Sequence, residues 1–308
     1  MSLDFALSLG GLVAGVMVGL TGMGGAALVT PMLVLIFGIS PAAAVSSDVV
    51  ASAIMKPVGA LVHIRARTVH WGIVGWLSVG SVPGVIIGTV IFGRVLGSSD
   101  AGKLIQSWLG WVLIVALAAM LARTWLTARA SHLRGEHSPT GRDQRVRPIL
   151  TVALGAGVGM VVGMTSVGSG SLIITCLLLL YPLLRPSFTV GTDLTQAVPM
   201  LIAGAVAHAG FGSVSIAVVI SLLIGQIPGV WIGARLSSRY DGHVLRWLLM
   251  VVLAATALKL LGVSSLIAGM IAVIGVVVVI GLILRERVSA RRARPDLASV
   301  SPAPLPRR

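Results

Sequence analysis

Apolar stretches of about 20 residues recur along the chain and are separated by short polar segments. A helix needs roughly that many apolar residues to cross a bilayer, and backbone in lipid must satisfy its own hydrogen bonds. The pattern therefore predicts an all-α polytopic membrane protein. The predicted spans are 42–63, 70–93, 104–126, 187–209, 214–236, 244–262 and 264–284.

Two further apolar regions, 3–39 and 149–184, are longer than one span. Each is interrupted by a patch rich in Gly, Ser or Thr. We expect two short helices around a break in each region. Hydropathy leaves open whether these short helices cross the membrane or enter and return.

The two halves of the chain resemble each other at an offset of 144 to 145 residues. Scattered glycine matches could come from composition, but Asp, His and Pro matches in one register would not readily do so. The sequence therefore predicts two homologous helical repeats. The matched pairs are Gly11 and Gly155, Gly15 and Gly159, Gly19 and Gly163, Thr21 and Thr165, Gly24 and Gly168, Asp48 and Asp193, His63 and His208, and Pro83 and Pro228.

Arginines gather in two polar segments, and these set the expected orientation. Residues 127–148 form a basic linker between the first repeat, 1–126, and the second, 149–262. An additional span at 263–284 leads to a basic tail at 285–308. Because Lys and Arg favour cytoplasmic loops, we expect the linker and the tail to be cytoplasmic.

Counting spans from these two segments places the loop after His63 inside and its counterpart after His208 outside. The repeats are then inverted, which is a common plan of secondary transporters. Their binding sites lie near the membrane midplane, on interrupted helices at the repeat interface. The glycines that recur at every fourth position in 11–19 and 155–163 indicate close helix packing and not a binding site.

Composition agrees with a membrane protein and argues against several other classes. Apolar residues make up 56% of the chain, charged residues 10%, and the mean hydropathy is +1.02. The net charge of +14 is concentrated in the linker and the tail, and nothing around these clusters resembles a nucleic-acid-binding module. We expect a multi-pass protein of the bacterial inner membrane, surrounded by lipid.

The two interruptions are candidate parts of an anion path. Free N–H groups and the positive end of a helix dipole at a break can bind an oxyanion, which glycines allow to approach the backbone. Ser and Thr hydroxyls add donors. Helix packing is the alternative role for these patches. The candidate binding residues are Thr21, Gly22, Gly24 and Gly25 in the first patch, and Thr165, Ser166, Gly168, Ser169 and Gly170 in the second.

Charge inside a membrane span is costly and usually functional, and three charged residues within the predicted spans are the candidates: Asp48, Lys56 and Asp193. Asp48 and Asp193 occupy equivalent positions near the start of their spans. They could couple transport to protons, or they could cap their helices by accepting backbone N–H bonds. Lys56 could attract an anionic substrate or neutralise an acid from the other repeat.

No cluster of Cys, His or carboxylates has metal-ligand spacing, no nucleotide-binding motif is present, and we expect no cofactor. A membrane-embedded enzyme would need a nucleophile–base or metal constellation, and none is visible. The leading hypothesis is thus a secondary active permease for a small anion, driven by an ion gradient, with H⁺ as a candidate coupling ion. An anion channel or a membrane-embedded enzyme is the alternative.

Several of these segments resemble the sulfite exporter (TauE/SafE-type) family. In the first half they are GLTGMGGAALVTPML, AVSSDVVASAIMKPVGALVH and VGSVPGVIIG; in the second half the segment is VGTDLTQAVPMLIAGAVAHAGFGSVSIAVVISLLIGQIPGVWIGARL. The resemblance covers roughly residues 10–262 and implies an inner-membrane permease with a duplicated helical unit, linked to export of sulfite and organosulfonates. The family often has Gly-Thr-Asp in both halves, whereas this chain has Ser46-Ser47-Asp48 in the first.

Overall fold

The computed structural model describes residues 5–21, 26–96, 101–133, 145–182, 184–211, 213–237, 243–271, 273–277 and 281. Every regular element within these ranges is a helix. The named helices are α1 (Phe5–Thr21), α2 (Ala26–Leu35), α3 (Pro41–Arg65), α4 (Trp71–Leu96), α5 (Ala101–Leu133), α6 (Pro148–Thr165), α7 (Ser171–Leu180), α8 (Pro186–Ala209), α9 (Ile216–Ser237) and α10 (His243–Leu260).

Six helices are long and apolar enough to cross a membrane, which confirms the prediction of an all-α polytopic membrane protein. They fall on α3, α4, α5, α6, α8 and α9. The span predicted at 244–262 corresponds to α10, His243–Leu260, and an apolar helix at Ser265–Val277 lies within the span predicted at 264–284. Helix α5 continues to Leu133, past the residue at which the basic linker was expected to begin.

The expected interruption of region 149–184 is present. Helix α6 ends at Thr165, and α7 begins at Ser171 after a turn. In region 3–39, α1 ends at Thr21 and α2 begins at Ala26. Residues 22–25 between them, which include Gly22, Gly24 and Gly25, lie outside the described residues.

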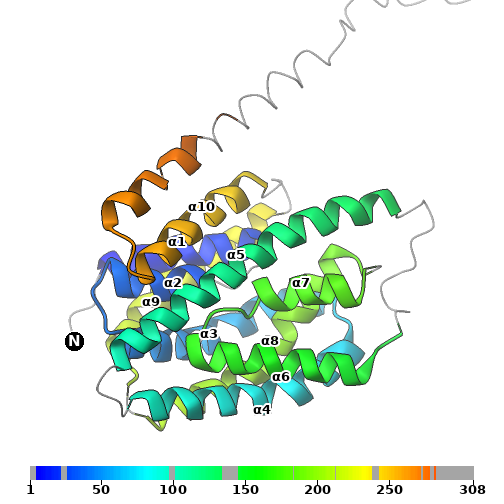
Figure 1. Ribbon diagram of the computed structural model, residues 1–308. Helices are drawn as coiled ribbons and strands as arrows, with labels where there is room; N and C mark the ends of the chain where they lie inside the picture. The colour runs from blue at the N-terminus through cyan, green and yellow to red at the C-terminus, as the bar shows by residue number, and fades with distance from the viewer. Residues whose placement is uncertain are drawn as a thin grey trace, which may run out of the picture.

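Six of the helices form a row in the order α1, α9, α3, α8, α4, α6, in which each packs against the next (Figure 1). Exchanging the two sequence repeats converts this order into its reverse, because α1 corresponds to α6, α3 to α8, and α4 to α9. The centre of the row is therefore the contact between α3 and α8. A second group consists of the helices α2, α5, α7 and α10. In this group α5 packs against both α7 and α10, and α10 packs against α2.

A pair of equivalent hydrogen bonds ties the halves together on either side of this centre. The backbone N–H of Ser215, just before α9, donates to Ser47 Oγ on α3 at 3.0 Å. The backbone N–H of His70, just before α4, donates to Thr192 Oγ1 on α8 at 3.0 Å. Since 47 and 192, and 70 and 215, differ by the same 145 positions, the two bonds are counterparts under the repeat. The residue before each aspartate thus anchors the opposite half.

Glycines allow the outer pairs of the row, α1 with α9 and α4 with α6, to approach until their backbones touch. A Cβ at Gly155, Gly159 or Gly163 of α6 would overlap a carbonyl oxygen of α4, at Leu77, Ser81 and Val85 respectively. Gly11 and Gly15 of α1 meet the carbonyls of Leu222 and Gln226 on α9 in the same way. Such close approach lets helices associate in lipid, where no hydrophobic effect drives them together. These five contacts confirm the packing role expected for the glycines.

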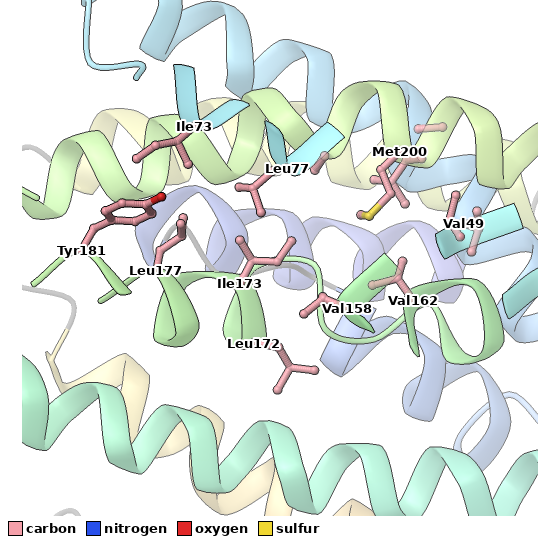
Figure 2. Close-up of a cluster of buried hydrophobic side chains, with 14 of the residues drawn as sticks. Val49, Ile73, Leu77, Val158, Val162, Leu172, Ile173, Leu177, Tyr181 and Met200 are labelled. Atoms are coloured by element: carbon pink, nitrogen blue, oxygen red, sulfur yellow. The ribbon is translucent and has the colours of Figure 1, made fainter. Parts of the chain in front are cut away.

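An apolar cluster built from α3, α4, α6, α7 and α8 surrounds the second interruption (Figure 2). Leu77 of α4, Val158 of α6 and Ile173 of α7 are among its buried members. Figure 2 shows the α7 side chains Ile173 and Leu177 directed into this cluster. The turn between α6 and α7 is therefore held from both of its ends by packed helices.

The glycine contacts can be tested with two substitutions in the same helix. Gly159→Leu places a side chain against the Ser81 carbonyl of α4, whereas the exposed Gly157 has nothing within 4 Å of its would-be Cβ. We predict that Gly159→Leu lowers stability by about 1–3 kcal/mol or more, while Gly157→Leu has little effect. Thermal unfolding in detergent measures the difference, and equal melting temperatures for the two variants would contradict it.

Candidate functional site

The turn between α6 and α7 is shaped by residues with left-handed backbone. Ser166 has φ 61°, Gly168 has φ 118° and Gly170 has φ 129°. Values this far into positive φ favour glycine. The chain leaves α6 with the Ser166 N–H bonded to the Val162 carbonyl at 2.7 Å, and enters α7 with the Leu172 N–H bonded to the Gly168 carbonyl at 3.2 Å. The hydroxyls of Ser166 and Ser169 are thereby placed in the turn.

Lys56 reaches this turn from the other half of the protein. Its ammonium donates to Ser169 Oγ at 2.7 Å and to the Ser169 carbonyl oxygen at 3.1 Å. The lysine is 1% exposed. A buried ammonium needs partners for its three donors, and two of them come from a segment 113 residues further along the chain. Lys56 also lies within electrostatic range of Asp193 and Asp48.

Asp48, on the same helix as Lys56, is also bound to the turn. Its Oδ2 accepts from Ser166 Oγ at 3.0 Å and from Thr30 Oγ1 of α2 at 2.6 Å. No described residue donates to Oδ1, and the whole side chain is buried. Asp48 therefore joins α3, α2 and the turn through one oxygen atom.

Asp193 occupies the equivalent place on α8 but has a different environment. It is fully buried, and no described residue donates a hydrogen bond to either of its carboxylate oxygens. Lys56 and Arg123 of α5 are the cations within electrostatic range. The Gln196 side chain is near this carboxylate, but its amide nitrogen has no hydrogen-bond acceptor among the described residues. Its amide oxygen accepts from Ser81 Oγ at 3.2 Å.

The capping alternative for the two aspartates is wrong. Helix α3 begins at Pro41 and α8 at Pro186, and neither has an acidic residue in its first turn. Both carboxyls therefore lie beyond the reach of the free N–H groups at the helix start. The predicted spans began at 42 and 187, one residue from the observed starts, so each aspartate lies in the second turn of its helix, beyond the cap.

His208 closes the edge of the site on α8. One ring nitrogen, Nε2, is 2.9 Å from the Gly163 carbonyl oxygen of α6, and the other, Nδ1, is 3.0 Å from Ser46 Oγ of α3. The ring also packs on Phe92 of α4, with the centroids 5.0 Å apart. Through these contacts the buried His208 ring links α8 to α3, α4 and α6, and both of its ring nitrogens have hydrogen-bond partners.

The structure brings together part of the predicted site. Asp48 accepts from Ser166 and Lys56 donates to Ser169, so two residues of α3 contact the same turn. Asp193 lies within electrostatic range of Lys56. Thr165 does not join this group, since its hydroxyl bonds to the Val161 carbonyl of its own helix at 2.8 Å. Gly168 and Gly170 shape the turn. Of the first patch, α1 ends at Thr21, whose side chain lies outside the described residues together with Gly22, Gly24 and Gly25.

Sequence reasoning missed two members of the site, Thr30 and Arg123. Arg123 is 7% exposed within the apolar part of α5. A basic residue inside a predicted span was itself a usable signal, because such residues face the protein interior. Thr30 had no such signal, since hydroxyls are common in membrane helices.

Comparison with known proteins identifies the family. The family model described as "Sulfite exporter TauE/SafE" matches residues 7–260. The chain belongs to the TauE/SafE sulfite exporter family. The matched range includes every residue of the site described above, from both repeats.

Relatives with curated names are similar over most of this TauE/SafE chain. The probable membrane transporter protein YjnA of Bacillus subtilis is 34% identical over 260 residues, which is 84% of this chain and all of that protein. A probable membrane transporter protein of Xylella fastidiosa is 28% identical over 83% of this chain and 94% of its own length. No solved structure matches the chain. Membrane transport is therefore the activity of this protein, which spans the bilayer several times.

The site combines buried cations, carboxyls and hydroxyls. Lys56 and Arg123 supply positive charge next to two buried carboxyls, and the turn supplies hydroxyls. Among the described residues, no group of three or more His, Cys, Asp or Glu side chains could hold a metal ion. The chemistry available at the site is thus hydrogen bonding, charge pairing and proton exchange.

Proposed function

We propose that this TauE/SafE protein is a secondary active transporter that moves a small anion, such as sulfite or an organosulfonate, across the bacterial inner membrane. The observation that carries the proposal is the buried Lys56, which donates to Ser169 at the break in the opposite repeat. A cation held at a helix break between two repeats is a suitable place for an anion in a transporter. The family description, sulfite exporter, supports this class of substrate.

Charge balance links the anion to a proton. In their ionised forms, the cations Lys56 and Arg123 and the carboxylates Asp48 and Asp193 cancel. Adding an anion to this buried group leaves an uncompensated negative charge, which is costly in a low dielectric. Protonation of one aspartate removes that charge. Proton and anion binding therefore favour each other, and by linkage the effect is reciprocal.

The same proposal includes alternating access through an inverted repeat. The palindromic order of the six-helix row and the paired Ser47 and Thr192 hydrogen bonds support a two-fold relation between the halves. The arginines of the linker and the tail support an orientation in which equivalent segments run in opposite directions.

Two cysteine positions test the inversion. We predict that Ala66→Cys, after α3, is labelled from the cytoplasmic side and Phe211→Cys, after α8, from the external side. Both are made in a Cys176→Ala background, because Cys176 is the one native cysteine. A membrane-impermeant maleimide applied to intact cells and to inverted vesicles distinguishes the sides. Labelling of both positions from one side would contradict the inversion.

Binding of a named anion tests the function itself. We predict that sulfite, thiosulfate or methanesulfonate raises the melting temperature of the purified protein and that acetate does so less. A ligand at about 100 times its Kd stabilises the native state by about 2.7 kcal/mol. The shift with methanesulfonate should be larger at mildly acidic than at mildly alkaline pH, because the proton and the anion bind together.

Two variants serve as controls for that measurement. Lys56→Met should remove the ligand-induced shift, because the cation is lost, whereas Gly157→Ala on the exposed side of α6 should preserve it. The anion-site proposal fails if none of these anions changes the melting temperature of the unaltered protein. It also fails if Lys56→Met retains the full shift.

A further inference from the structure

The two aspartates are equivalent in sequence but not in structure. One Asp48 oxygen accepts hydrogen bonds from two hydroxyls, those of Thr30 on α2 and Ser166 in the turn. Asp193 receives no hydrogen bond from any described residue. A carboxylate that already accepts two short bonds from fixed donors is stabilised in its charged form and ties its neighbours in place. A carboxyl without such donors is free to gain and lose a proton.

We propose that the two aspartates have separate tasks: Asp193 carries the coupling proton, and Asp48 is a fixed link that holds the turn between α6 and α7 to α3. This inference rests on the transport function proposed above and assigns its proton to one residue. The sequence alone gave no basis for choosing between the two.

The surroundings of Asp193 fit proton exchange. Lys56 of α3 and Arg123 of α5 are the cations that act on it, and Asp48 acts on the same Lys56. Helix α4, which also packs against α8, has only Arg94, in its last turn, as a charged residue, and α7 has none. On its own helix, Gln196 lies one turn further along and has an amide nitrogen with no acceptor. Among the described residues, two titratable histidines also neighbour this part of α8: His63 of α3 lies beside Gly191, and the backbone N–H of His70 donates to Thr192 Oγ1.

Charge pairing couples the exchange of the proton to the movement of the anion. When Asp193 is ionised, it offsets the positive charge of Lys56 and Arg123. A proton from water on one side forms an O–H bond on the Asp193 carboxyl, and this cancels its negative charge and makes the cations available to the anion. After the site opens to the other side, the anion leaves, the O–H bond breaks and the proton returns to water. One proton and one anion thus move together, and no other reactant is needed.

The fixed role of Asp48 follows from what its oxygen binds. Its link to Ser166 holds the beginning of the turn, and the Lys56 bond to Ser169 holds the end. Asn at position 48 keeps a carbonyl oxygen that can accept both hydroxyls, although it loses the charge. Asn at position 193 cannot bind and release a proton. The same substitution therefore has different consequences at two equivalent positions.

The test compares Asp193→Asn with Asp48→Asn in liposomes containing the purified full chain. Labelled methanesulfonate is the probe, because the anion of a strong acid does not change its own charge with pH as sulfite does. Two quantities are measured: exchange of methanesulfonate at equal pH on both sides, and the ratio of net uptake with and without a pH gradient. Exchange by the unaltered chain establishes the proposed function separately from the proton assignment.

We expect the unaltered chain to show a gradient ratio of about tenfold or more, in the range of typical coupling energies. Asp193→Asn should reduce this ratio to near one while exchange continues at an altered rate. Asp48→Asn also removes a negative charge that balances the cations, so it should slow exchange and lower the gradient ratio, but not to one, because Asp193 still exchanges its proton. Asp193→Glu, which retains an ionisable carboxyl, should also keep the gradient dependence, with its pH profile displaced.

Three results would overturn the inference. Gradient dependence that survives in Asp193→Asn means that another group carries the proton. An equal loss of gradient dependence in Asp48→Asn and Asp193→Asn means that the two aspartates do not have separate tasks. If Asp193→Asn fails to insert, loss of gradient dependence in Asp193→Glu contradicts the assignment. If the unaltered chain exchanges neither methanesulfonate nor sulfite, the proposed function itself fails, and the proton assignment fails with it.

Discussion

The burial of the Lys56 ammonium is the constraint on which the arrangement of this site depends. A charge inside a membrane protein is tolerated only when the protein supplies its partners. Helix α3, on which Lys56 lies, supplies Asp48, but the direct hydrogen bonds come from Ser169 at the break in the second repeat. An irregular turn within the membrane also needs polar partners, because its backbone and hydroxyl groups cannot be left in contact with lipid. Lys56 and the turn therefore satisfy each other's hydrogen-bonding groups, and they belong to different halves of the chain.

This dependence relates the site to the packing of the helices. The glycine contacts clamp α4 to α6 and α1 to α9, and each clamp joins one repeat to the other. The two sequence repeats are thus not two separate bodies. The site lies where the six-helix row, which contributes Asp48, Lys56 and Asp193, meets α2, α5 and the start of α7. We expect the movements of transport to occur along this boundary, since the glycine contacts leave little space for sliding within the clamped pairs.

Much of the fold could be predicted from the sequence, because lipid imposes simple rules. Length and hydropathy located the spans, and the repeat located Asp48 and Asp193 at equivalent positions. The site was only partly predictable, because its contacts join residues that are more than 100 positions apart, as Ser169 is from Lys56. No periodicity indicates which hydroxyl meets which carboxylate. The repeat in fact suggested that the two aspartates are alike, and only the contacts of Thr30 and Ser166 show that they differ.

The most direct test of this interdependence is the free energy of unfolding of Ser169→Ala, compared with Ser78→Ala. The Ser169 hydroxyl binds the Lys56 ammonium, whereas the buried Ser78 hydroxyl has no partner among the described residues. A hydrogen bond to a charged group contributes about 1.5–3 kcal/mol, so Ser169→Ala should cost about that much, and Ser78→Ala should cost nothing. In a Lys56→Met background, the cost of Ser169→Ala should disappear. Equal costs for the two serines, or an undiminished cost of Ser169→Ala without the lysine, would contradict the dependence of Lys56 on the break in the opposite repeat.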